Sequence, residues 1–153
     1  MTFLRALMLL ALVVWIGGII FFAFVLAPTV FTVLPTTAMA GNVVSRSLTI
    51  LHWMGIGFAF VFLICSLLYN RAKYSRLKMF TMLHVLVVIM LILTLVSQFA
   101  ITPRMQVLRA HLQPLDDIAY KAFFRLHYWS TGLEGGVLFL GLAALFLTAR
   151  RFS

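Results

Sequence analysis

Acidic residues are almost missing from this chain, which has 3 Asp and Glu against 12 Lys and Arg in 153 residues. Charged residues of both signs make up 10% of the sequence, whereas about a quarter of a typical soluble domain is charged. Hydrophobic residues reach 64%, so lipid rather than water is the expected solvent. The net charge of +9 does not indicate nucleic-acid binding, because the cations lie between apolar runs, where they act as topology signals.

Cysteine occurs once, as Cys65 within an apolar run, which excludes an intrachain disulfide and a paired-cysteine metal site. The chain also lacks a CxxCH haem-attachment motif, a nucleophile elbow around Ser130 and a phosphate-binding glycine loop. We therefore expect the protein not to be an enzyme.

Four apolar runs, each near the roughly 20 residues that a helix needs to cross a bilayer, account for most of the chain. An open sheet cannot satisfy its backbone in lipid, so all four runs are expected to be helices. We predict an all-α, antiparallel, four-helix transmembrane bundle that forms one domain over residues 1–153. Its helices are expected at about residues 6–27, 48–69, 79–101 and 120–149.

Proline and glycine refine this prediction. Pro28 is expected to end or kink the first helix and Pro103 to break the third, because proline has no backbone N–H to donate. Beyond Pro103, residues 104–112 alternate apolar and basic side chains, which predicts a short amphipathic helix at the membrane surface. The glycines at positions 17, 18, 55 and 57 are expected to let neighbouring helices approach closely.

The densest group of cations lies in the short connection between the second and third runs, and short basic loops stay in the cytoplasm. Both termini are then cytoplasmic as well, in agreement with Arg5 at one end of the chain and Arg150 at the other. We expect the protein in the cell (inner) membrane, with a membrane-protein partner or a second copy of itself as further contacts. Anionic lipids are expected near the basic group itself, Arg71, Lys73, Arg76 and Lys78.

Glu134 is the most costly residue within the predicted spans, because a charged side chain at the bilayer centre costs about 2.5–3.5 kcal/mol on insertion scales. It needs a partner, a proton or a water-filled cavity. In a helix, His127, Thr131 and Glu134 would share one stripe. The candidate partners for this carboxylate are a histidine, Arg104, Arg125, Gln98 or Thr94.

Two histidines are expected near the outer face, His52 about one turn inside the second run and His127 at the start of the fourth, whereas His84 lies near the inner face. On facing helices, His52 and His127 could ligate haem b, or hold copper or zinc with a third ligand such as Glu134 or His111. The alternative for such a histidine is a hydrogen bond to a neighbouring helix.

Several short motifs together resemble the transmembrane protein 205-like family of small multi-pass proteins. They are Trp15–Gly17, Phe24–Pro28, Leu51–Gly55, Thr102–Arg104 and Phe123–His127 with Ser130. The resemblance covers the whole chain; it implies a four-helix integral membrane protein and no established catalytic activity. It draws attention to His52, Pro103, Arg104, Phe124, Arg125, His127 and Ser130. The chain departs from the family pattern at Glu134, where a small polar or amide residue is expected.

The leading hypothesis is a non-enzymatic inner-membrane protein whose outer-side polar cluster binds a small ligand or ion, or contacts a membrane partner. The residues of this predicted cluster are His52, Arg104, Arg125, His127, Ser130 and Glu134. The alternative hypothesis is a redox module that binds haem b or copper through His52 and His127.

Overall fold

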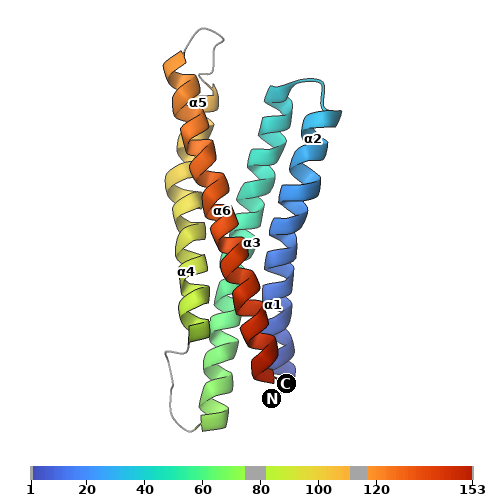
Figure 1. The fold of residues 1–153 in the computed structure, drawn as a ribbon, viewed down its shortest axis with the longest axis vertical. Helices are drawn as coiled ribbons and strands as arrows, with labels where there is room; N and C mark the ends of the chain where they lie inside the picture. Colours follow the sequence, from blue (N-terminus) through green and yellow to red (C-terminus); the bar gives the residue numbers. More distant parts are fainter. Residues whose placement is uncertain (1, 75–81, 111–116, 153) are drawn as a thin grey trace.

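The protein is a bundle of four long helical rods that run alternately up and down (Figure 1). The computed structural model describes residues 2–74, 82–110 and 117–152, and within these ranges only Leu34, Pro35 and Thr36 lie outside helices. Both termini lie at the same end of the bundle, here called the proximal end; the opposite end is called the distal end. The predicted all-α, four-helix architecture is confirmed.

The first two rods are joined by a short distal turn. The first consists of α1 (Thr2–Phe21), the π-helical segment η1 (Phe22–Leu26) and α2 (Ala27–Val33). The second is the single helix α3 (Thr37–Tyr74), whose 38 residues span about 57 Å at 1.5 Å per residue. Since a bilayer core is about 30 Å thick, the ends of α3 extend beyond it.

The third and fourth rods repeat this pattern. The third consists of α4 (Met82–Val96), the π-helical segment η2 (Ser97–Ile101) and α5 (Thr102–Ala110). The fourth is the single helix α6 (Asp117–Phe152). In the described part of the chain, four helices are long and apolar enough to cross a membrane, so this is a multi-pass membrane protein.

Pro28 and Pro103 do not end their helices, so the predicted break at Pro103 is wrong. Each π-helical segment ends two residues before a proline, η1 before Pro28 and η2 before Pro103. In an α-helix a proline ring clashes with the carbonyl four residues earlier, and a wider turn just before the ring offers room for it. The segment expected as a separate surface helix is therefore α5, a continuation of the third rod; residues 111 and 112 lie outside the described ranges.

The start of α3 follows from three consecutive residues. Leu34 is extended, as the residue before a proline tends to be, and it ends α2. Thr36 then caps the new helix, because its Oγ1 accepts a hydrogen bond from the backbone N–H of Met39 at 3.2 Å. The turn thus fixes where α3 begins, and with it the register of every polar residue along that helix.

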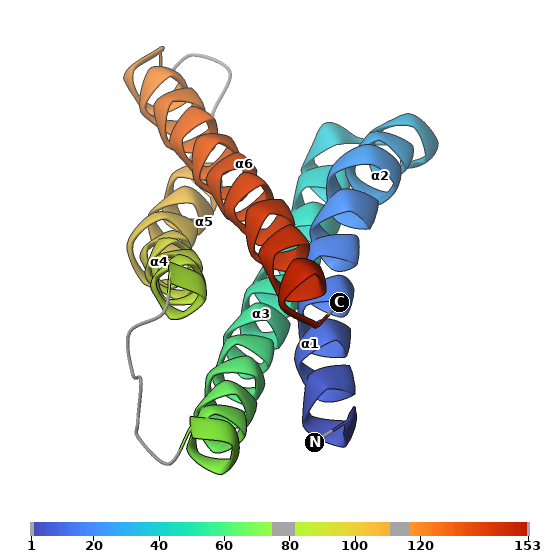
Figure 2. The same cartoon turned by 60° about the horizontal axis from the view of Figure 1, so that its bottom comes forward.

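The four rods form a ring in which α1 and α4 each pack against both α3 and α6. Helices α3 and α6 therefore lie diagonally opposite each other, with α6 crossing in front of α3 in Figure 2. Trp15, Phe62, Met90 and Val137 are among the buried side chains that fill the space between the rods. At the distal end, α2 and the start of α3 diverge from α5 and the start of α6 (Figure 2).

The basic group between the second and third rods is described only in part. Arg71 is exposed near the proximal end of α3, Lys73 belongs to the last turn of that helix, and Arg76 and Lys78 lie outside the described residues. The cytoplasmic placement of this end and its contact with anionic lipids stay predictions.

Two of the four glycines expected at helix contacts are such contacts. A Cβ at Gly55 would lie 2.4 Å from Nε1 of the buried Trp15, and one at Gly18 would lie 2.9 Å from Leu51. Nothing lies within 4 Å of the corresponding point at Gly17 or Gly57, so the prediction is wrong for these two. Trp15 fills the contact between α1 and α3.

We expect Gly55→Ala to destabilise the protein by about 1–3 kcal/mol, because the new methyl group overlaps the Trp15 ring. The measurement is the temperature at which half of the detergent-solubilised protein survives heating as monodisperse material. Gly57→Ala is the matched control on the same helix, where the methyl group meets open space. Equal melting temperatures for the two variants would contradict the close contact of α1 with α3.

Candidate functional site

Polar side chains from three rods meet inside the bundle at His52 of α3. This imidazole is only 1% exposed. Its Nδ1 lies 2.8 Å from Oε1 of Gln98 in η2, and its Nε2 lies 2.5 Å from Oε1 of Glu134 in α6. We call these three residues, His52, Gln98 and Glu134, the polar triad.

The triad is positioned by the secondary structure around it. Gln98 lies in η2, the wide turn that precedes Pro103, and π-helical turns are frequent at functional sites because they displace side chains from the regular helical register. The hydroxyl of Thr102 supports this turn by donating to the carbonyl of Ser97 at 2.9 Å. The bond from His52 to Glu134 joins the diagonal helices α3 and α6 across the bundle.

The arrangement of donors fixes how many protons the triad holds. Since the Gln98 oxygen is an acceptor, Nδ1 of His52 must carry a proton and donate it. Between Nε2 and Glu134 a single shared proton then completes the short bond. Whether that proton lies on the nitrogen or on the oxygen, the pair of side chains has no net charge.

This neutrality explains how a carboxyl group is tolerated inside an apolar bundle. A lone carboxylate or a lone imidazolium would carry a desolvation cost of several kcal/mol. In the triad, each buried polar group instead has a partner from another helix. A histidine was one of several candidate partners for Glu134, and in the structure the residue bonded to this carboxyl group is His52.

The other predicted site residues are not all gathered at the triad. Arg104 and Arg125 line a shared pocket of about 490 Å³ between α5 and α6. His127 is exposed and stacks on Phe123 with the two rings 8° from parallel. Ser130 is buried one turn before Glu134 on α6. The predicted single cluster is therefore divided among the triad, the pocket and the surface of α6.

The predicted polar stripe on the fourth helix is divided in the same way. Thr131 is exposed, and its hydroxyl donates to the backbone carbonyl of His127 at 3.0 Å. Glu134 is mostly buried, with 15% of its side chain exposed. Of the stripe, only Glu134 takes part in the triad.

The metal and haem hypothesis for His52 and His127 stays a prediction. Both ring nitrogens of His52 have hydrogen-bond partners in the triad, and His127 lies on the exposed surface. Within the described ranges there is no group of three or more His, Cys, Asp and Glu side chains that could hold a metal ion.

Gln98 is the triad member that the predicted site residues omit. It was considered only as a hydrogen-bond partner for Glu134, whereas in the structure it binds the far side of the imidazole. The sequence signal that could have indicated Gln98 is its position five residues before Pro103. A proline inside a membrane-length helix requires a local change of helical geometry in the preceding turn.

Comparison with known proteins gives one match. A family model described as a domain of unknown function (DUF4149) matches residues 10–114. The matched range includes His52 and Gln98 and ends before α6, which carries Glu134. No curated protein and no solved structure matches the chain. The resemblance to the transmembrane protein 205-like family stays a prediction.

We expect His52→Leu and Glu134→Leu each to cost about 3–5 kcal/mol of unfolding free energy, because each leaves a buried polar partner unsatisfied. The double variant should cost clearly less than the sum of the two, since it removes both partners. The measurement is reversible unfolding in mixed micelles. His127→Leu, an exposed histidine on α6, is the control and should change the free energy by under about 0.5 kcal/mol. Additive effects at His52 and Glu134 would contradict a direct bond.

Proposed function

We propose a function from the geometry of the polar triad. The chain belongs to the family described as a domain of unknown function (DUF4149), and this description names no activity. The protein is a non-enzymatic, multi-pass protein of the cell (inner) membrane, and its polar triad binds one exchangeable proton. The observation that carries this proposal is the 2.5 Å contact between His52 and Glu134 inside the bundle. Ionisable groups within membrane spans typically mark ion or proton pathways.

Gaining or losing the shared proton changes the contact between the diagonal helices. Without it, the lone pair of Nε2 would face a carboxylate oxygen at 2.5 Å, which is repulsive. With a second proton, the pair would carry a buried positive charge. The triad with one proton shared between Nε2 of His52 and Glu134 is thus the form that links α3 to α6. Exchange of this shared proton is therefore coupled to the separation of these helices.

Two further features support exchange with water. Glu134 retains 15% exposure of its side chain, so the neighbouring helices do not enclose it completely. The hydroxyl of Ser97, the residue before Gln98, is fully buried and has no hydrogen-bond partner in the described part of the chain. Buried polar atoms of this kind are commonly satisfied by an internal water molecule, which can carry a proton.

The proton site is tested by infrared difference spectroscopy of the protein in nanodiscs across about pH 3 to 10, an interval that includes the ordinary pKa values of carboxyl and imidazole groups. The chain has only 3 acidic residues, so the carboxylic C=O stretch of Glu134 can be isolated by subtracting the Glu134→Gln spectrum. We expect one titrating carboxyl band that is absent from Glu134→Gln and shifted in His52→Gln.

Asp117→Asn is the matched control, because it removes the carboxylate at the start of α6 and leaves the triad intact. This variant should keep the Glu134 band and its response to pH. If wild-type protein and Glu134→Gln gave the same spectra at every pH, Glu134 would not exchange a proton and the proposed function would fail.

We also propose that the proximal end, which carries both termini and Arg71, faces the cytoplasm. The support is the excess of cations on that side, in the one short connection between α3 and α4 and near both termini, because such an excess sets the orientation of multi-pass proteins. A green fluorescent protein fused to the C-terminus should therefore fluoresce, whereas alkaline phosphatase at the same position should stay inactive. The reverse result would invert the topology and leave the triad chemistry unchanged.

A further inference from the structure

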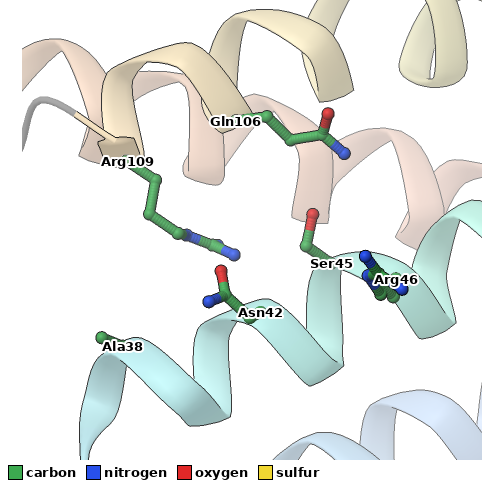
Figure 3. Close-up of a pocket in the computed structure, with 6 residues that line it drawn as sticks. All are labelled: Ala38, Asn42, Ser45, Arg46, Gln106 and Arg109. Atoms are coloured by element: carbon green, nitrogen blue, oxygen red, sulfur yellow. The ribbon is translucent and has the colours of Figure 1, made fainter.

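A second polar site lies at the distal end, where the first turns of α3 face α5. It is a pocket of about 560 Å³ lined by Ala38, Asn42, Ser45, Arg46, Gln106 and Arg109 (Figure 3). None of these residues belongs to the polar triad or was among the predicted site residues. Its lining residues come from the start of α3 and from α5, which belong to the two pairs of helices that diverge at this end (Figure 2).

Arg109 is held in place by three helices. From α5 its guanidinium reaches toward α3, above Asn42 in Figure 3, and its Nη1 donates a hydrogen bond to the backbone carbonyl of Gly41. The absence of a side chain at Gly41 makes this possible, because a Cβ there would lie 3.2 Å from Cζ of Arg109. On α6, the ring of Phe123 lies 5.4 Å from the same carbon, a cation–π distance.

The lining is positively charged and rich in hydrogen-bond donors. Arg46 on α3 and Arg109 on α5 approach the pocket from opposite sides, and none of its described lining residues is acidic. Asn42, Ser45 and Gln106 add amide and hydroxyl donors. Two guanidinium groups in a lining whose described residues include no carboxylate favour an anion.

We propose that this pocket binds a phosphate group, carried either by an anionic lipid or by a soluble phosphate compound. A volume of about 560 Å³ leaves room for the group attached to the phosphate. Arg46 lies just before the apolar run of α3, so the pocket is at the depth of lipid head groups. Guanidinium groups suit this ligand, because their paired N–H donors match two phosphate oxygens.

The test uses the full-length protein purified in a neutral detergent, with two probes. Titration calorimetry measures the binding of inorganic phosphate, and native mass spectrometry measures retention of phosphatidylglycerol against phosphatidylcholine. We expect Arg46→Gln to weaken binding about tenfold or more through the loss of a charge-assisted contact. Gln106→Glu, which places a carboxylate in the pocket, should abolish binding.

Arg104→Gln is the matched control, since it removes the same charge from α5 but lines the other pocket. Saturable phosphate binding that responds to Arg46→Gln and Gln106→Glu would identify a soluble phosphate as the ligand. Selective retention of phosphatidylglycerol with the same response would identify a lipid head group. Two results would overturn the proposal: neither probe distinguishes wild-type protein from these two variants, or Arg104→Gln weakens binding as much as Arg46→Gln does. Both results are independent of the outcome of the infrared test at the triad.

Discussion

The hydrogen bond between His52 and Glu134 is the interaction on which the interior of this bundle depends. It joins the two helices that are diagonally opposite and otherwise separated by α1 and α4. Lipid offers no hydrogen bonds, so a carboxyl group within a span must find its partner inside the protein. The requirement that both side chains stay satisfied fixes the rotation of α3 and α6, and Gln98 extends the same constraint to the third rod.

The prolines have a related role at the distal half. Pro28 and Pro103 each follow a π-helical segment, and the segment before Pro103 presents Gln98 to the imidazole. Beyond this turn, α5 carries Arg109, which contacts α3 and α6 at the distal end of the bundle. One local irregularity therefore contributes to both polar sites, since it sets the direction of α5 as well as the position of the amide.

The two sites were not equally visible in the sequence. His52 and Glu134 could each be singled out, because a polar residue inside a membrane-length apolar run is costly wherever it lies. Their pairing could not be derived, since spacing along one helix says nothing about the rotation of another. The same limit explains why His127 was grouped with them although it is exposed. Arg46 was counted only as a topology signal and Arg109 also as a basic residue of the predicted surface helix. They were not connected with each other, because they lie 63 positions apart in the chain.

By itself, the sequence determined that this chain lies in a membrane and forms four helices, because apolar runs of spanning length have few alternatives in lipid. It also marked four glycines as helix contacts, but it did not distinguish Gly18 and Gly55, which make such contacts, from Gly17 and Gly57, which do not. The tertiary structure decided the order of the rods around the ring, the continuation of the third rod past Pro103 and the choice of His52 as the partner of Glu134. These depend on how side chains from separate helices fit together, and hydrophobic periodicity along one chain does not contain that information.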